Sequence, residues 1–249
     1  MHRDWEPLSA GVRRCRLPFL DVTVGLVWGT RGVLIVDCGT TLSESQEIAD
    51  DVRELTGRQP TDVVLTHHHF DHILGSGGFA GARILASEPV LRTLADRDVA
   101  NRSLGEEALS YGAAPAEVER ALGALQPAEH VDRHAMIDLG GRVVTVEHPG
   151  RGHTDHDLVV VIPGDPVVVF CGDLVEESAD PAIGADSDLA CWPRSLDRLL
   201  CLGGEDAIYV PGHGAIVDAA FVRRQRDWLT SRCATPVRAS RGRSQPNPG

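Results

Sequence analysis

The chain has 249 residues, and its 36 acidic and 24 basic side chains give a formal net charge of −12. All of the basic residues are arginine, because the sequence contains no lysine. This acidity argues against a protein that follows nucleic-acid phosphates with a basic surface. A hydrophobic fraction of 42% indicates a folded domain, and no apolar run exceeds five residues, whereas a membrane span needs about 20. We therefore expect neither a nucleic acid nor a membrane as a partner.

The cysteine pattern and the first residues bear on the cellular location. The six cysteines are scattered and form no Cys-x-x-Cys pair: Cys15, Cys38, Cys171, Cys191, Cys201 and Cys233. Small secreted domains typically use their cysteines as a disulfide framework. No apolar stretch of the kind found in secretory signals follows the first residues. We expect reduced thiols and a cytoplasmic protein.

Strands and helices alternate in the predicted N-terminal half. Strands are expected at 22–28, 32–37, 62–66 and 83–86, the first two joined as a hairpin. The helix between the second and third strands is predicted to begin at a capping box formed by Ser43 and Gln46. It is predicted to end at Gly57, which can adopt the left-handed conformation of a helix cap. A short helix is expected at 75–80.

A change of composition separates this half from the next. Residues 87–135 are rich in Ala, Glu and Arg with Leu at helical intervals, which predicts a helical insert. Beyond it we expect strands at 142–147, 158–162, 167–171 and 207–210, and helices at 193–202 and 218–229. Residues 234–249 are too polar to bury and are predicted to be a disordered tail. The rest, 1–233, is predicted to be one α/β domain whose two αβ halves pack sheet to sheet.

Residues 67–72 read His-His-His-Phe-Asp-His and directly follow the predicted buried strand 62–66. In an extended chain a residue and its second neighbour point the same way, so His67 and His69 can bind one cation while His68 packs elsewhere. The turn that follows presents Asp71 and His72 to a neighbouring position. Imidazole and carboxylate ligands suit zinc, iron or manganese. The alternative, a surface histidine run or tag, is disfavoured because the segment is far from both termini.

Three more potential ligands each follow a predicted strand in a turn that contains glycine. They are His153 in Gly-His, Asp173 in Gly-Asp and His213 in Pro-Gly-His-Gly. Any one of them alone is more often structural or solvated than a ligand. Together with the four in 67–72 they make seven candidate ligands, which is enough for two metal ions.

These motifs in this order resemble the signature of the metallo-β-lactamase superfamily, over residues 20–230 apart from the insert. The resemblance implies a four-layer αβ/βα sandwich with metals at one edge between two sheets. It also implies a metal-ligand set of His67, His69 and His153 for one ion and Asp71, His72 and His213 for the other, with Asp173 between them. Asp37 matches a position of the family that supports a ligand from behind.

The function implied by this resemblance is that of a dinuclear metal-dependent hydrolase. Two divalent ions, Zn²⁺ in the first place and Fe or Mn as alternatives, would supply a metal-bound hydroxide at neutral pH. Asp71 is the candidate catalytic residue, because its carboxylate can accept a proton or pass it to the leaving group. A Gly-x-Ser-x-Gly nucleophile motif is absent from the sequence.

The sequence departs from individual branches of the family, and these departures narrow the range of expected substrates. The antibiotic-hydrolysing branches lack the bridging Asp, and the glutathione-thioesterase and nuclease branches carry extra domains or basic surfaces. A small-molecule ester, lactone, thioester or similar bond remains as the expected substrate. The alternatives are a mononuclear iron dioxygenase of the persulfide-oxidising type, a β-lactamase, and a metal-binding protein without turnover. The last is disfavoured because structural zinc sites usually have four ligands and are closed.

The segment 174–190 follows Asp173 and is expected to be a loop that forms a wall of the pocket. It carries five acidic residues and no basic one: Glu176, Glu177, Asp180, Asp186 and Asp188. If these carboxylates face the pocket, neutral or cationic substrates should be preferred over anions. The alternative is a solvated acidic loop without influence on the substrate.

Overall fold

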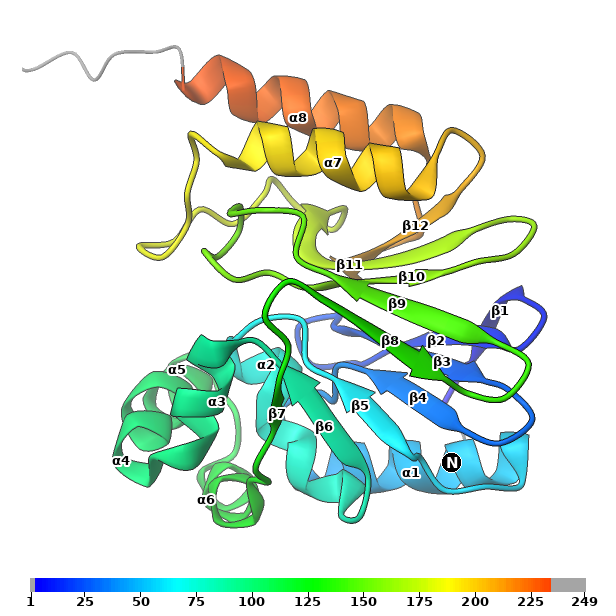
Figure 1. Cartoon of the computed structure of the whole chain (residues 1–249). Helices are drawn as coiled ribbons and strands as arrows, with labels where there is room; N and C mark the ends of the chain where they lie inside the picture. The colour runs from blue at the N-terminus through cyan, green and yellow to red at the C-terminus, as the bar shows by residue number, and fades with distance from the viewer. Residues whose placement is uncertain (1–2, 234–249) are drawn as a thin grey trace, which may run out of the picture.

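The computed structural model describes residues 3–233, and in it two β-sheets face each other with helices on both outer sides (Figure 1). Helix α1 (Leu42–Thr56) covers one sheet, and α7 (Trp192–Gly203) and α8 (Ala219–Cys233) cover the other. This arrangement confirms the predicted four-layer αβ/βα sandwich. The predicted tail, 234–249, lies outside the described residues. Within residues 3–233, no helix combines the length and the apolar character that a membrane crossing needs.

The first sheet has seven strands in chain order. They are β1 (Glu6–Ser9), β2 (Val12–Arg16), β3 (Thr23–Trp28), β4 (Val33–Val36), β5 (Asp62–Val64), β6 (Arg83–Ala86) and β7 (Glu129–His130). Strands β1 to β4 are antiparallel, which includes the predicted hairpin, and β4 to β7 are parallel. The sequence analysis missed β1, β2 and β7, because they are short or carry charged side chains in place of an apolar run.

The second sheet has five strands in the order β12 (Ile208–His213), β11 (Val168–Glu176), β10 (Val159–Ile162), β9 (Val143–Glu147) and β8 (His134–Asp138). Only β11 and β12 are parallel. The prediction that a loop begins at Leu174 was wrong. Strand β11 continues to Glu176, because its end pairs with His213 of β12 and every residue of the strand is buried.

Helix α1 begins at a capping box, but not at the predicted one. The Thr41 side chain accepts a hydrogen bond from the backbone N–H of Glu44, and the Glu44 carboxylate accepts one from the N–H of Thr41. Ser43 instead donates to Glu117 of α6 (Pro115–Ala124). Both pairs have the required spacing, so sequence alone does not separate them. The predicted cap Gly57 is confirmed, with a φ of 71°.

Short helices connect the strands of the first sheet. Helix α2 (Phe70–Ile73) and a 3₁₀ helix, η1 (Leu74–Phe79), follow β5, where the sequence predicted a helix at 75–80. The predicted insert contains α3 (Glu88–Ala95), α4 (Arg97–Ala100), the π-helix η2 (Asn101–Gly105), α5 (Glu106–Ser110) and α6 (Pro115–Ala124). It also contains β7 and the start of β8, which the sequence analysis did not anticipate.

The apolar layer between the sheets holds them at a fixed separation. Val27, Val64, Val146 and Phe170 are among its buried residues. Gly25 of β3 is required here, since a Cβ atom at this position would lie 2.6 Å from the Phe170 ring. The close packing brings the ends of β5, β11 and β12 to the same edge of the sandwich. That edge carries the candidate site.

Candidate metal centre

All seven candidate ligands meet at this edge. Four of them come from one segment: His67 follows β5, His69 is the residue before α2, and Asp71 and His72 lie in α2. The other three come from the second half of the chain. His153 lies in the loop between β9 and β10, Asp173 lies in β11, and His213 is the last residue of β12. The sequence separates these residues by up to 146 positions, from 67 to 213, and the two sheets bring them back together. Gly212 of β12 leaves room at the centre, since a Cβ atom at this position would lie 1.9 Å from Asp173 Oδ1.

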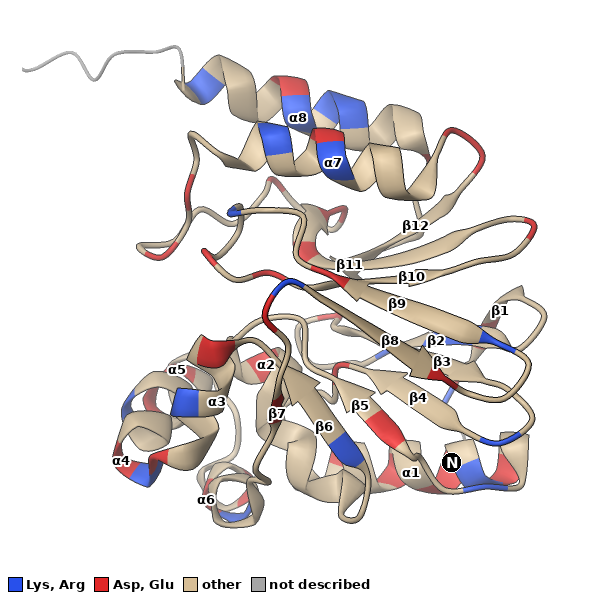
Figure 2. Ribbon diagram, viewed as in Figure 1, with Lys and Arg blue, Asp and Glu red and all other residues tan. Residues whose placement is uncertain are grey.

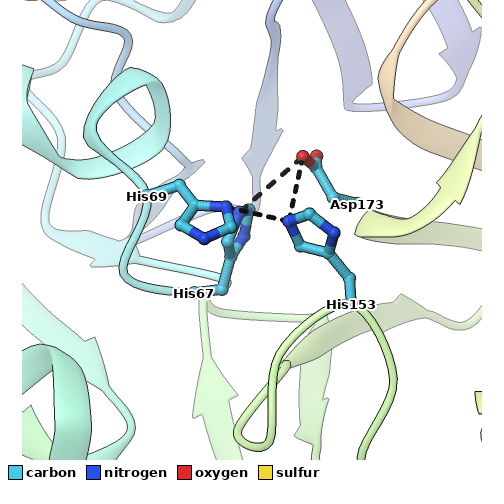
Figure 3. Close-up of side chains that lie close together, drawn as sticks. All are labelled: His67, His69, His153 and Asp173. Atoms are coloured by element: carbon cyan, nitrogen blue, oxygen red, sulfur yellow. Dashed lines mark hydrogen bonds and ion pairs between the residues drawn. The ribbon is translucent and has the colours of Figure 1, made fainter. Parts of the chain in front are cut away.

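Four of the side chains form a first cluster, His67, His69, His153 and Asp173, in which one potential ligand atom from each lies within 4.8 Å of the others. His153 Nε2 is 2.8 Å from His69 Nδ1 and 3.5 Å from Asp173 Oδ2. His67 Nε2 is 3.8 Å from the same carboxylate oxygen. Figure 3 shows the three imidazole rings and the carboxylate turned toward one point.

A second cluster consists of Asp71, His72 and His213, whose potential ligand atoms also lie within 4.8 Å of one another. His213 Nε2 lies 3.3 Å from Asp71 Oδ2 and 3.3 Å from His72 Nε2. Asp173 touches this cluster as well, with Oδ1 3.1 Å from His72 Nε2 and Oδ2 3.4 Å from His213 Nε2. The Asp173 carboxylate therefore stands between the two clusters and belongs to both.

Hydrogen bonds behind the rings fix which nitrogen atoms face the centre. His213 Nδ1 donates to the carbonyl oxygen of Leu20 (2.7 Å), and His153 Nδ1 donates to that of Ala182 (3.1 Å). Because a carbonyl can only accept, Nε2 of each ring is left unprotonated in the neutral form and free to bind a metal. These outer contacts therefore aim the ligand nitrogens inward.

Asp37 performs the same role for His72. Its carboxylate accepts hydrogen bonds from the backbone N–H (2.8 Å) and the hydroxyl (2.9 Å) of Thr66, and its Oδ2 lies 2.9 Å from His72 Nδ1. Asp37 adopts a φ of 61°, which is unusual for a residue other than glycine. Strained backbone of this kind is concentrated at functional sites, and here it places the Asp37 carboxylate beside His72.

The electrostatics differ between the clusters. Burial lowers the pKa of His67 well below its ordinary value, and burial lowers that of His153 to about 4. Burial also acts to lower the pKa values of His72 and His213, but the nearby carboxylates, above all Asp173, outweigh it. They raise the pKa of His72 well above its ordinary value and that of His213 to about 12. His67 and His153 of the first cluster are thus neutral, while the rings of the second cluster hold protons. Burial also acts to lower the pKa of His69, but the hydrogen bond with Asp186 outweighs it and raises that pKa.

Two buried polar atoms at the centre lack a hydrogen-bond partner among residues 3–233. They are Nε2 of His67 and Oδ1 of Asp173. Leaving such an atom unsatisfied costs roughly 1–3 kcal/mol, so a folded protein rarely keeps two of them side by side without a reason. Unprotonated imidazoles and carboxylates that converge on one point are the ligands of a divalent transition metal. The residues present fit such an ion.

A cleft of about 770 Å³ opens onto the clusters. Its floor includes Asp71, His153, Asp173 and His213. Its walls come from the insert, through Ser103, Glu107 and Tyr111, and from the chain between β11 and α7, through residues such as Asp180, Ile183 and Asp186. Among residues 3–233, no arginine lines the cleft.

The family model of the metallo-β-lactamase superfamily matches residues 17–213. The chain belongs to this superfamily. A metallo-β-lactamase type 2 of Bacillus cereus is 26% identical over 208 residues, which are 82% of this chain and 72% of the relative. An uncharacterized protein of Mycobacterium tuberculosis is 32% identical over 214 residues, 81% of this chain and 88% of the relative.

Solved structures of the superfamily share the fold. The DIM-1 metallo-β-lactamase superposes with a TM-score of 0.70 at 18% identity, covering 93% of this chain and 99% of that one. The FIM-1 enzyme of Pseudomonas aeruginosa, solved in a mono-zinc form, gives 0.69 at 19% identity, with coverage of 94% and 98%. At this level of identity the likeness concerns the architecture alone.

The sequence analysis placed Asp186 in the acidic segment 174–190 but did not predict that it contacts a candidate ligand. Its Oδ2 lies 2.9 Å from His69 Nε2, on the side of the ring opposite the Nδ1 atom that faces His153. A separation of 117 residues in the chain left no local signal of this contact. His68 belongs to neither of the two clusters, although it also lines the cleft. Its Nδ1 lies 2.9 Å from His156 Nε2, and its Nε2 lies 3.7 Å from Asp186 Oδ2.

The segment predicted as an acidic wall divides into two kinds of residue. Glu176, Asp180 and Asp186 line the cleft. Glu177 and Asp188 instead accept hydrogen bonds from the backbone N–H groups of Ala215 and Cys191, which stabilise local turns. The prediction of a carboxylate-lined pocket is therefore correct for three of the five.

An Asp186→Asn variant should bind metal about 10–100-fold more weakly, the usual effect of removing the partner behind a ligating histidine. A competition titration against a chromogenic chelator would measure the loss. Asp180→Asn is the matched control, because Asp180 lies in the same segment, is exposed, and faces Arg232 at 3.8 Å. Equal metal affinities in the two variants would contradict a positioning role for Asp186.

Proposed function

We propose that this protein is a dinuclear metal-dependent hydrolase that cleaves an ester, lactone, thioester or similar bond of a small molecule. The observation that carries the proposal is the position of Asp173, whose carboxylate is shared by two clusters of potential ligands. A single metal would not need both clusters. Membership of the metallo-β-lactamase superfamily supports the hydrolytic class.

Each cluster would hold one divalent ion, with Zn²⁺ as the first candidate. His67, His69 and His153 would hold one, Asp71, His72 and His213 the other, and Asp173 would touch both. Bound ions of this kind supply hydroxide near neutral pH and stabilise negative charge on the attacked oxygen. The hydrogen bonds to Leu20, Ala182 and Asp37 would keep the ligand nitrogens in place during turnover.

Asp71 is the proposed proton carrier. Its carboxylate lines the cleft, with Oδ2 3.3 Å from His213 Nε2. Burial acts to raise the pKa of Asp71, but the charges of His72 and His213 outweigh it and hold the pKa below its ordinary value. The group is therefore ionised at neutral pH and can accept a proton from the nucleophile or hand one to a leaving group.

A β-lactamase activity is the second candidate, favoured by the type 2 metallo-β-lactamase relative of Bacillus cereus. The lining of the cleft argues against a β-lactamase activity. A β-lactam antibiotic carries a carboxylate. In the described part of the chain no arginine lines the cleft to bind that group, whereas several carboxylates would repel it. We therefore place neutral or cationic substrates first.

The test combines metal analysis with a substrate panel. Protein purified without added metal should contain about two equivalents of metal per chain, and chelation should abolish turnover that added Zn²⁺ restores. The panel should hold lactones, aryl esters, thioesters, phosphodiesters and nitrocefin, and we expect a neutral ester or lactone to react fastest. One iron per chain together with oxygen consumption would contradict the hydrolase and support the dioxygenase. Preference for nitrocefin would establish the β-lactamase.

We also propose a cytoplasmic location. All six cysteines are unpaired, and three of them, Cys15, Cys38 and Cys171, are buried. Unpaired thiols are typical of proteins in a reducing compartment.

A further inference from the structure

The outer part of the cleft, between the insert and the chain after β11, contains one carboxylate that has no hydrogen-bond or ion-pair partner among residues 3–233. Glu107 of α5 is half-buried, and its side chain makes no hydrogen bond or ion pair with another residue of 3–233. Burial raises its pKa and nearby His69 acts to lower it, while Asp71 and Asp186 add repulsion that raises it further. A negative charge kept in such a place is poorly compensated by the protein itself.

The other cleft carboxylates are all engaged. Asp71 and Asp173 belong to the metal clusters, and Asp186 supports His69. Glu176 accepts hydrogen bonds from the N–H and hydroxyl of Ser178, and Asp180 faces Arg232. Figure 2 shows acidic segments on α2, α5 and the chain between β11 and α7, and arginines on α7 and α8 as well as on helices of the insert. Glu107 is thus the cleft carboxylate, within the described residues, that is left for a ligand.

Apolar surface lies beside this carboxylate. Tyr111 is 59% exposed, although its ring stacks on buried Phe70 with ring centroids 5.5 Å apart. Ile183, which is 46% exposed, also lines the cleft. Large apolar side chains exposed inside a concave site are typical of ligand contacts. The floor of the same cleft holds Asp173, which is 7% exposed and whose Oδ1 has no hydrogen-bond partner within 3–233.

A carboxylate beside an exposed aromatic ring is the combination that binds organic cations. The carboxylate neutralises the charge, and the face of the ring attracts a cation through its quadrupole. An alkylated ammonium group also gains from apolar contact, which a phosphate or carboxylate group of a ligand would not. The repulsion from the cleft carboxylates would act against an anionic substrate in the same place.

Building on the proposed hydrolase, we propose that its substrate carries a cationic, alkylammonium-type group that Glu107 and Tyr111 bind while the scissile bond lies at the metal centre. The insert then supplies the specificity, and the two sheets supply the reactive groups. Nothing in the 67–72 motif or the other strand-end ligands encodes this preference.

The kinetic test uses three esters with one acyl group and different alcohols: choline, its neutral isostere 3,3-dimethylbutan-1-ol, and an alcohol of similar size with a carboxylate. We expect the choline ester to exceed the neutral ester in kcat/KM by roughly tenfold, mainly through KM, which is the scale of a partly desolvated cation–π contact with a neighbouring charge. The anionic ester should be the poorest. Glu107→Gln and Tyr111→Leu should each bring the cationic-to-neutral ratio toward one.

Glu106→Gln is the matched control, because Glu106 precedes Glu107 in the same helix, is exposed, and does not line the cleft. Glu106→Gln also removes one negative charge. Its ratio of kcat/KM for the cationic ester to kcat/KM for the neutral ester should equal that of the unaltered protein. A ratio of one in the unaltered protein, or equal ratios in the Glu106 and Glu107 variants, would overturn the proposal.

A binding measurement separates this proposal from the hydrolase itself. Calorimetric titration with choline and with 3,3-dimethylbutan-1-ol needs no turnover, and choline should bind more tightly in the unaltered protein and in Glu106→Gln but not in Glu107→Gln. If choline binds in this way and no ester is hydrolysed, the hydrolase fails and the cation site stands. If esters are hydrolysed and neither assay shows a charge preference, the cation site fails and the hydrolase stands.

Discussion

A His67→Ala variant should lose at least half of its bound metal and lower kcat/KM by more than about 100-fold, while remaining folded. Removing a partner behind a ligand already costs about 10–100-fold, so removing a ligand should cost more. His67 is fully buried, and its Nε2 atom has no hydrogen-bond partner within residues 3–233, so the ring has no structural role at that atom. Metal analysis, turnover and circular dichroism on the same preparation would measure the three effects.

His130→Ala is the control for this experiment. His130 lies on β7, is exposed, and is not part of the clusters or the cleft lining. Its replacement also removes one imidazole, but it should leave metal content and turnover at the level of the unaltered protein. Full metal content and full turnover in His67→Ala would remove His67 from the site, and with it the argument for the first cluster. His69→Ala should behave like His67→Ala.

The sequence predicted the site and the fold best where the interacting residues lie close together in the chain. The spacing of His67, His69, Asp71 and His72 places them together through local geometry alone, and the two sheets then add the strand-end residues. The helix cap at Gly57 is equally local. These features follow from the backbone conformation of a few consecutive residues.

Features that depend on distant parts of the chain could not be predicted in this way. Asp186 reaches His69 across 117 residues, and Glu107 reaches the cleft only because the insert folds over α2. The true capping box at Thr41 and Glu44 competes with an equally good pattern two residues later, at Ser43 and Gln46. The end of β11 looked like an acidic loop because Glu176 is charged, but pairing with His213 keeps it in the sheet. In each case tertiary contact decides between local alternatives.

Metal binding at the second cluster should depend on pH more steeply than binding at the first. The carboxylates around His213 overcome the effect of burial and raise its pKa to about 12, and they raise that of His72 well above its ordinary value. Both rings therefore hold protons at neutral pH and must release them to bind a metal. Affinity rises about tenfold per pH unit for each proton displaced, so the slope for this cluster should approach two protons between pH 6 and 8.

The first cluster should show a slope of at most one proton. Burial lowers the pKa of His67 well below its ordinary value and that of His153 to about 4, so both rings are already unprotonated at neutral pH. His69 is the exception, because Asp186 outweighs its burial and raises its pKa. The protein should therefore bind its first metal at mildly acidic pH and its second as the pH rises toward 8.

Titrations at pH 6, 7 and 8 against a chelator of known protonation would measure both slopes, and an indicator dye in weak buffer would count the protons released by each equivalent. Asp71→Asn weakens the second cluster and isolates the first, so its single remaining step should keep the shallow slope. Equal slopes for both equivalents, or proton release at the first equivalent only, would contradict the assignment. The unequal protonation of the rings would then not govern the order in which the two clusters fill.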